Sequence, residues 1–157
     1  GLETVCLRFF NIFGPRQRAD SPYSGVIALF AATMLAGKRP CIQGDGLQSR
    51  DFTYVANVVQ ANLLACEKDA AVGQVMNVAC GQRYTLLDLH RELTELMGTV
   101  VQPILAPACA GDVKHSMAAI ERAQQLLGYM PQTGWRQGLQ QTVEWYRREF
   151  ASSTSVG

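Results

Sequence analysis

Short apolar runs alternate along the chain with longer segments in which apolar residues recur every three or four positions. The short runs are rich in β-branched and aromatic residues and predict strands; they cover 5–10, 41–42, 50–55, 74–79 and 100–105, the last interrupted by Pro103. The longer segments predict helices; they cover 23–36, 57–67, 85–97, a stretch capped by Ser116 and stopped by Gly128, and 138–150. Short strands with four to five helices predict a mixed α/β fold.

Start and stop residues sharpen the prediction for two of the helices. Thr85 and Asp88 have the spacing of a capping box at the start of 85–97, and Gly98 follows that segment. The segment 23–36 is apolar almost all round and ends at a glycine, which predicts a buried helix. On the helix 57–67, the residues that share one apolar face are Val59, Leu63 and Cys66.

Size and composition are typical of a globular protein. The chain has 157 residues, of which 48% are apolar and 17% charged, and its net charge is +1. This length permits one domain, or a large piece of one, with its own core. The near-neutral charge argues against a nucleic-acid or membrane binder, and no apolar run reaches the roughly 20 residues of a membrane span. The N-terminus lacks a signal peptide and a starting Met, so we expect a chain that begins inside a larger protein.

The cysteines point to a reducing compartment. Their number is odd, their spacing is wide and no Cys-x-x-Cys occurs, which argues against a disulfide framework and a zinc ribbon. We therefore expect free, buried thiols and a cytoplasmic protein. The five positions are Cys6, Cys41, Cys66, Cys80 and Cys109.

Three polar clusters are candidates for ligand contacts. In the first, a strand ends in a polar loop, where Asn11 either meets a ligand or braces the turn through its own backbone. In the second, two glycines precede Arg50, which either grips phosphate oxygens or makes a weak surface pair with Asp51. In the third, Asp112 either accepts hydrogen bonds from sugar hydroxyls or bonds to nearby backbone.

Motifs for catalysis are missing from the sequence. There is no Gly-x-Gly-x-x-Gly, no Walker A pattern, no Gly-x-Ser-x-Gly, and no Tyr followed four residues later by Lys. We expect His115 to be a structural or surface residue and His90 to lie at the edge of the core, because neither has the carboxylate neighbours of a metal site. The residues therefore indicate a ligand-binding part without catalytic apparatus.

Four motifs follow one another along the chain. They are Leu7-Arg8-Phe9-Phe10-Asn11 with Gly14-Pro15-Arg16-Gln17; Tyr23-Ser24-Gly25-Val26-Ile27; Gly44-Asp45-Gly46 with Ser49-Arg50-Asp51-Phe52; and Gly111-Asp112-Val113-Lys114-His115-Ser116 with Leu127-Gly128-Tyr129 and Pro131. In this order, over about residues 2–150, they resemble the C-terminal part of the NAD-dependent epimerase/dehydratase family, the extended short-chain dehydrogenases that act on nucleotide sugars. The second and fourth motifs look most like bacterial UDP-glucose and UDP-N-acetylglucosamine 4-epimerases.

The resemblance implies an α/β fold in which this chain is the C-terminal substrate-binding portion of an extended short-chain dehydrogenase, with the Rossmann half absent. In the family that half holds NAD and the Ser/Thr, Tyr and Lys catalytic residues. We therefore expect no catalytic residue, no metal and no bound cofactor in this chain alone. Residues 1–150 would form the nucleotide-sugar binding domain, including a last strand of the Rossmann half near 4–10, and 151–157 a disordered tail.

The resemblance also implies roles for seven residues in substrate binding. Arg50 would hold the diphosphate and Asp112 the ribose hydroxyls, while Asn11 would contact the diphosphate or the sugar. The base pocket would be formed by Val26, Phe30 and the backbone near Ile42 and Gln43, which would read uracil.

Two positions depart from the family's pattern. Cys109 stands where the family usually has a second Arg on the diphosphate, and an uncharged thiol does not replace a guanidinium. Gln43 stands where an aromatic residue often stacks on the base. We therefore expect weak binding of UDP.

The predicted function is that of a substrate-binding fragment of a nucleotide-sugar epimerase, which binds the UDP part of a UDP-sugar and is not catalytic alone. One alternative is a fragment of a nucleotide-sugar dehydratase or decarboxylase of the same family. Another is a non-catalytic, self-associating structural remnant. We expect an apolar patch where residues 5–10 and the helix 23–36 would pack on the missing half, so the further partner is a second copy or that Rossmann half.

Overall fold

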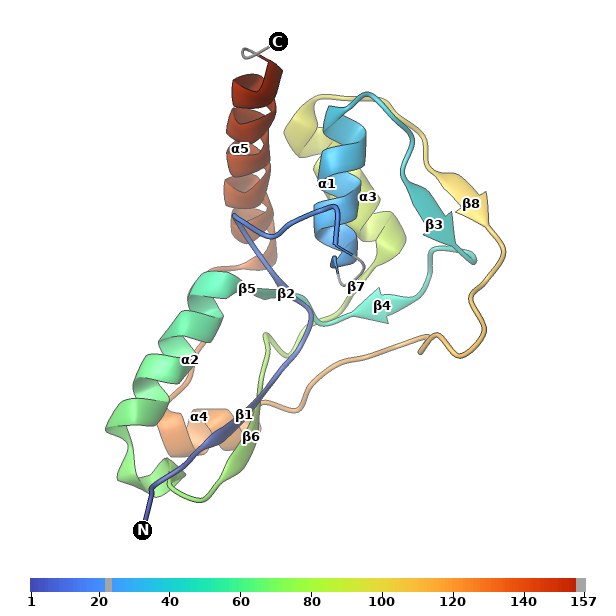
Figure 1. Cartoon of the computed structure of the whole chain (residues 1–157). Coiled ribbons are helices and arrows are strands. Elements are labelled where there is room, and N and C mark those ends of the chain that lie inside the picture. The colour runs from blue at the N-terminus through green and yellow to red at the C-terminus, as the bar shows by residue number, and fades with distance from the viewer. Residues whose placement is uncertain (22–23, 155–157) are drawn as a thin grey trace.

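The computed structural model, which describes residues 1–21 and 24–154, interleaves short strands with five α-helices (Figure 1). The strands are β1 (Cys6–Phe9), β2 (Ile12–Phe13), β3 (Cys41–Gln43), β4 (Ser49–Arg50), β5 (Thr53–Tyr54), β6 (Val75–Val78), β7 (Tyr84–Thr85) and β8 (Ile104–Ala106). The helices are α1 (Val26–Leu35), α2 (Val55–Glu67), α3 (Leu86–Met97), α4 (Glu121–Leu127) and α5 (Trp135–Thr154), with a 3-10 turn η1 (Asp69–Ala71). The predicted mixed α/β fold is confirmed.

In the described residues the strands pair in twos instead of forming one sheet. β1 lies parallel to β6, β2 to β5 and β3 to β8, whereas β4 and β7 are antiparallel. Parallel strands need long connections, so each parallel pair fastens segments that are far apart in the sequence.

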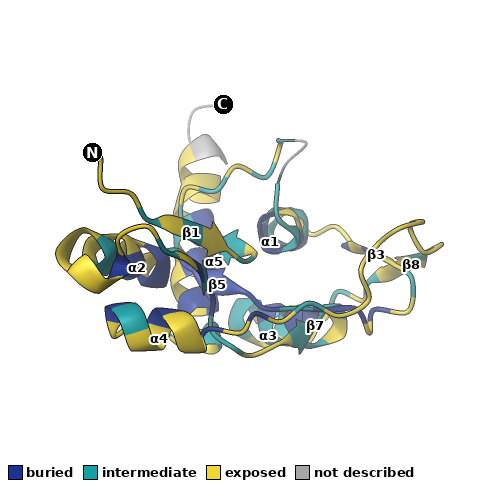
Figure 2. Cartoon of the chain, turned by 90° about the horizontal axis from the view of Figure 1, so that it is seen from below, coloured by how far each residue is buried: buried dark blue, intermediate teal, exposed yellow. Residues whose placement is uncertain are grey.

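The two larger clusters of buried side chains belong to different groups of helices, which lie apart in Figure 1, and Figure 2 marks buried positions in both groups. Helices α1, α3 and α5 enclose the larger cluster, and α2 and α4 flank β1 and β6 at the smaller one. The larger cluster contains Phe13, Ile27, Phe30, Met34, Ile42, Phe52, Tyr54, Leu89, Leu93, Leu139 and Val143. The smaller contains Ala61, Ala71, Met76, Val78, Ala123, Leu127 and Tyr129.

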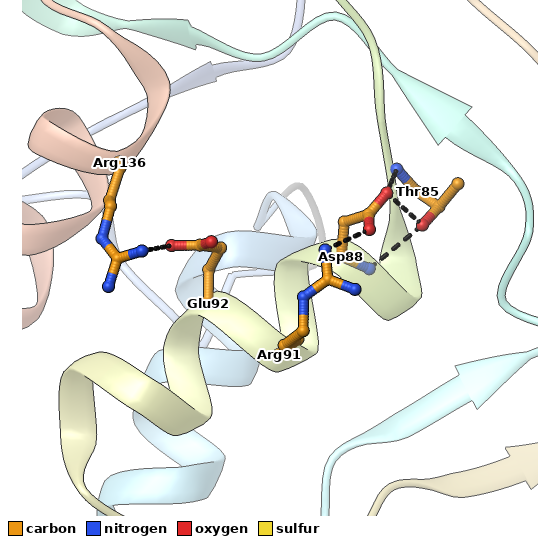
Figure 3. Close-up of polar contacts among 5 residues, drawn as sticks. All are labelled: Thr85, Asp88, Arg91, Glu92 and Arg136. Atoms are coloured by element: carbon orange, nitrogen blue, oxygen red, sulfur yellow. Dashed lines mark hydrogen bonds and ion pairs between the residues drawn. The ribbon is translucent and has the colours of Figure 1, made fainter.

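Local signals define helix α3 as predicted. The Thr85 hydroxyl accepts a hydrogen bond from Asp88 N at 3.0 Å, and the Asp88 carboxylate accepts one from Thr85 N at 3.1 Å (Figure 3). This is the reciprocal pair of a capping box. Gly98 ends the helix in the left-handed conformation, with φ 64°.

Helix α5 begins at Trp135, three residues before the predicted start. The Trp135 ring stacks on Tyr84 at 4.5 Å and on Phe52 at 5.0 Å, and this packing fixes the first turn. Gly138 therefore lies inside the helix, where its lack of a Cβ is required, because a Cβ there would come within 2.9 Å of the Tyr54 ring.

Three further predictions are corrected by long-range contacts. The strand 50–55 is divided into β4 and β5, because Asp51 between them turns its carboxylate to the N–H groups of another loop. Ser116 does not cap α4, which begins at Glu121; its N–H donates to Ser49 O at 3.0 Å. The strand predicted over 100–105 begins only after Pro103, which has no N–H to donate.

The chain ends differ from the prediction as well. Residues 151–154 continue α5, so the predicted disordered tail is wrong over these residues, and 155–157 lie outside the described residues, as do Pro22 and Tyr23. The helix predicted to begin at 23 is described from Val26. All five thiols are unpaired, but four are exposed and Cys80 is half-buried, so their expected burial is wrong.

An apolar surface covers α2 and the β1–β6 pair. On α2, Val59 is 53% and Leu63 61% exposed, and Phe9 and Val75 on the two strands are each 43% exposed. Helix α1 instead packs into the core as predicted, so the apolar patch involves α2 where we expected α1. Within the described residues, no helix has the length and apolar character needed to cross a membrane.

Candidate functional site

A cavity of about 520 Å³ lies between α1, β3, β4 and the loop that follows β8. Six of the seven predicted substrate contacts line it, although they come from segments up to about 100 residues apart. The lining residues are Asn11, Val26, Leu29, Phe30, Thr33, Pro40, Cys41, Gln43, Gln48, Arg50, Leu86 and Asp112.

The seventh predicted residue, Ile42, does not line the cavity. Side chains alternate along a strand, and on β3 Ile42 is fully buried in the core while Cys41 and Gln43 face the cavity. Cys41 was missed from the sequence, and the same alternation from Gln43 would have found it. Leu29 and Thr33 were missed too, although they follow Val26 and Phe30 at the helical spacing of three residues.

Arg50 projects from β4 toward the loop that carries Asp112. Its Nη1 donates to Ser49 O at 2.9 Å, and its Nη2 donates to the Asp112 carboxylate. The predicted alternative, a surface pair of Arg50 with Asp51, is wrong, because Asp51 is fully buried. Arg50 is the one cation among the described residues of this cavity.

Asp51, next to Arg50 in the sequence, instead forms hydrogen bonds with two other segments of the chain. Its carboxylate accepts the N–H groups of Cys80 and Gly81, each at 3.0 Å, and that of Ala118 at 3.3 Å. Burial raises the pKa of this carboxyl, against the effect of these hydrogen bonds. Asp51 therefore joins the loop after β6 and the segment before α4 to the strand that carries Arg50.

Asn11 both lines the cavity and fixes a turn. Its φ of 36° is in the left-handed region, and its side-chain amide donates to Asp51 O at 3.0 Å. Thr53 N donates back to Asn11 O at 3.2 Å. Asn11 thus braces the turn through the neighbouring strand, and not through its own backbone.

A short strap ties the Asp112 loop to β4. Ser49 N donates to Lys114 O at 2.8 Å, and the Ser49 hydroxyl lies 2.9 Å from His115 Nδ1. His115 is exposed, as predicted, but its partner, the buried Ser49, was not foreseen. His90 is buried at the core edge, as predicted, with its Nε2 2.8 Å from Val101 O.

Cys109 lies beside a second, smaller cavity of about 230 Å³. Gln43, Gln48 and Asp112 border both cavities, so the two are neighbours. Cys109 is exposed. The cation in the smaller cavity is Lys114, which lies 3.6 Å from Asp45.

The described residues do not form a cradle for the pyrophosphate of NAD. Such cradles use N–H groups of a glycine-rich loop between a strand and a helix. After β6 the N–H groups of Cys80 and Gly81 already hold the Asp51 carboxylate, and β1 leads into β2, not into a helix. Nor does any group of three or more His, Cys, Asp or Glu in the described residues suit a metal ion.

Comparison with known proteins agrees with this geometry. A sequence model of the NAD dependent epimerase/dehydratase family matches residues 1–79. The chain belongs to this family. The UDP-glucose 4-epimerase of Thermotoga maritima, solved with UDP-glucose, is 38% identical to it with a TM-score of 0.91, covering 96% of this chain and 48% of that one. The UDP-N-acetylglucosamine 4-epimerase of Methanobrevibacter ruminantium, solved with UDP-N-acetylmuramic acid, is 37% identical with a TM-score of 0.89, covering 95% and 47%.

The chain is also similar to a family member that catalyses a different reaction. The UDP-N-acetyl-alpha-D-glucosaminuronate decarboxylase of Bacillus cytotoxicus is 28% identical over 153 residues, which are 94% of this chain and 47% of the relative. The chain thus spans about half the length of the relatives it matches. The family predicted from the four motifs is confirmed, and the fold is a partial domain of an extended short-chain dehydrogenase.

Proposed function

We propose that the cavity of about 520 Å³ lined by Arg50 and Asp112, called the larger cavity because its neighbour beside Cys109 is smaller, binds the UDP part of a UDP-sugar. Arg50 binds the diphosphate, and Asp112 accepts hydrogen bonds from the ribose hydroxyls. Asn11 contacts the diphosphate or the sugar. Val26 and Phe30 cover the base, and the backbone at Ile42 and Gln43 reads uracil. The observation that carries the proposal is that Arg50 and Asp112, 62 residues apart, meet at this cavity. The UDP-sugar ligands of the two solved epimerases support it.

The binding is weak, and the chain does not catalyse a reaction by itself. The diphosphate carries about two negative charges, and one guanidinium faces it. We therefore expect a dissociation constant for UDP of about 1 mM. Hydride chemistry requires a bound nicotinamide, and the described residues offer no cradle for it. In a whole protein of this kind the reaction is 4-epimerisation. The similarity to a decarboxylase keeps decarboxylation, or dehydration, as the second reaction within the family.

We further propose that residues 1–150 are the substrate-binding domain and that β1 is the last strand of a Rossmann half. Parallel sheets are normally covered on both faces, and an isolated two-stranded sheet is unstable. Cys6 N donates to Gln74 O, just before β6, and Phe10 N donates to Val78 O in β6, so the backbone groups of Leu7 and Phe9 point to the opposite edge of β1. A strand of an NAD-binding half fits that edge.

The exposed apolar surface favours one other candidate function, a structural remnant that self-associates. Val59 and Leu63 on α2 are exposed, and a groove of about 590 Å³ is lined by residues that include Leu7 and Phe9 of β1 and Cys66 of α2. Without an NAD-binding half, a second copy covers this surface. Binding of UDP separates the candidates, since a remnant that only self-associates does not bind it. The unpaired thiols favour a cytoplasmic location for either.

Titration of UDP into ¹⁵N-labelled protein, followed by NMR, tests the proposed function. Arg50→Ala should weaken UDP binding by about 1.5–3 kcal/mol, the range for hydrogen bonds to a charged group. Arg122→Ala is the matched control, because it removes the same charge from α4 at the other end of the molecule. The proposal fails if both variants bind UDP like the wild type, or if the wild type shows no binding at 10 mM, about ten times the expected dissociation constant.

A further inference from the structure

The carboxylate of Asp112 already accepts a hydrogen bond from Arg50, the residue that we assign to the diphosphate. Arg50 is largely covered, with 18% of its side chain exposed, and it donates one N–H to Asp112 and another to the backbone. A guanidinium is a donor only, and a carboxylate and a phosphate are both acceptors. Asp112 and an incoming phosphate therefore compete for the same N–H groups.

We propose that this competition makes the site selective for a diphosphate that is joined to a ribose, so that Asp112 excludes inorganic phosphate and pyrophosphate. The inference rests on the proposed UDP site and adds a specificity role to it. A single arginine does not by itself distinguish a nucleoside diphosphate from free phosphate or pyrophosphate.

After it releases Arg50, the Asp112 carboxylate gains a new donor from the ligand only when that ligand carries a ribose. When a nucleoside diphosphate binds, its phosphate oxygens take the N–H groups of Arg50, and its ribose hydroxyls donate to Asp112. Each acceptor keeps a donor, so the exchange costs little. Pyrophosphate brings no ribose hydroxyl, and Asp112 then loses its partner beside an anion of like charge. The Asp112 side chain is 42% exposed, so water replaces the lost donor, and repulsion between the carboxylate and the anion is what disfavours pyrophosphate.

The backbone keeps Asp112 from moving out of the way. Ser49 precedes Arg50 on β4 and exchanges two hydrogen bonds with the Asp112 loop, from Ser49 N to Lys114 O at 2.8 Å and from Ser116 N to Ser49 O at 3.0 Å. The loop is therefore anchored two residues after Asp112. Its carboxylate remains near the cation whether or not a ligand is bound.

The test compares UDP with sodium pyrophosphate in NMR titrations of the wild type and Asp112→Asn, with EDTA present to remove divalent cations. Asparagine keeps the size of the side chain and removes its charge. The matched control is Asp45→Asn, which removes the same charge from a neighbouring loop, where Asp45 contacts Lys114 and Leu47 N. Melting temperatures show whether each variant is folded.

For the wild type, we expect UDP to bind at least about ten-fold more tightly than pyrophosphate. Asp112→Asn should bind pyrophosphate about three- to ten-fold more tightly and UDP about three- to ten-fold more weakly, the range of one charged hydrogen bond after partial screening. Asp45→Asn should shift both affinities in the same direction, by less than about two-fold.

Each contrary result has a separate meaning. If the wild type and Asp112→Asn bind both ligands with the same ratio of affinities, the selectivity role is wrong, although the UDP site stands. If the wild type does not bind UDP but Asp112→Asn binds pyrophosphate, the proposed function is wrong while the competition for Arg50 is real. If neither protein binds either ligand, both proposals are wrong.

Discussion

Replacing Cys109 with arginine tests whether UDP binding is weak because Arg50 is the one cation that we assign to the diphosphate. The thiol is exposed and borders the smaller cavity, which shares Gln43, Gln48 and Asp112 with the larger one. An arginine at this position therefore has room to reach the ligand without entering the core. For the same reason, we expect the free energy of unfolding to change by less than about 0.5 kcal/mol.

The gain in UDP affinity follows from three opposing contributions. A new charged hydrogen bond is worth about 1.5–3 kcal/mol, and ordering the long side chain costs about 0.5–1.5 kcal/mol. Nearby Asp45 and Asp112 offer the new guanidinium alternative partners, which removes up to about 1 kcal/mol. The net gain is about 1 kcal/mol, or roughly five-fold in the dissociation constant.

The assay is NMR titration of UDP into the wild type, Cys109→Arg and the uncharged control Cys109→Gln, at low and at high salt. Cys109→Gln should bind like the wild type. The gain of Cys109→Arg should shrink as salt rises, because the contact is partly exposed. Equal affinities of the two variants at low salt, in proteins that are equally stable, would refute the assignment of this position to the diphosphate.

Three other predictions concern activity, assembly and stability. With NAD and UDP-glucose added, the chain alone should show no epimerase turnover in a coupled assay, since hydride chemistry needs a bound nicotinamide and the described residues form no cradle for it; turnover that persists through rigorous purification would contradict this. Light scattering should show a dimer or larger species at micromolar concentration, and Leu63→Glu on α2 should shift it toward the monomer; a monomeric wild type at high concentration would argue against self-association. Asp88→Ala should lower the free energy of unfolding at pH 7 by about 1 kcal/mol. Hydrogen bonding to the Thr85 hydroxyl, more than the pairing with Arg91, lowers the pKa of Asp88 from its ordinary 3.8. The stabilisation by Asp88 is therefore present above pH 3.8 and is lost as the pH falls through the lower pKa of the folded state. If the wild type and Asp88→Ala still differ by the same amount in urea unfolding at about pH 2, the ionic contribution of the cap is disproved.

Elements defined by adjacent residues could be predicted from the sequence. The capping box of α3 needs only Thr85 and Asp88, three positions apart, and Gly98 ends the helix by its own backbone freedom. The burial of α1 followed from its apolar composition. In the site, the likeness of four motifs to one family brought Arg50 and Asp112 together before any geometry was known.

Features that depend on distant segments could not be predicted. The Ser49–His115 contact joins residues 66 positions apart, and the start of α5 depends on a ring stack with Tyr84. Periodicity located the apolar stripe of α2, with Val59 and Leu63, but a stripe does not reveal what covers it. Asp51 beside Arg50 suggested a local pair, whereas the carboxylate binds N–H groups about 30 residues away.

The rate of Cys41 alkylation measures most directly whether UDP enters the larger cavity. Cys41 lines that cavity, while Cys6 and Cys66 are exposed thiols on β1 and α2 and serve as controls within the same molecule. The protein is treated with N-ethylmaleimide, with and without UDP, and each cysteine is followed by mass spectrometry. We predict that saturating UDP slows the modification of Cys41 while Cys6 and Cys66 react as before. Equal slowing at all three cysteines, or none at Cys41, would contradict the proposed site.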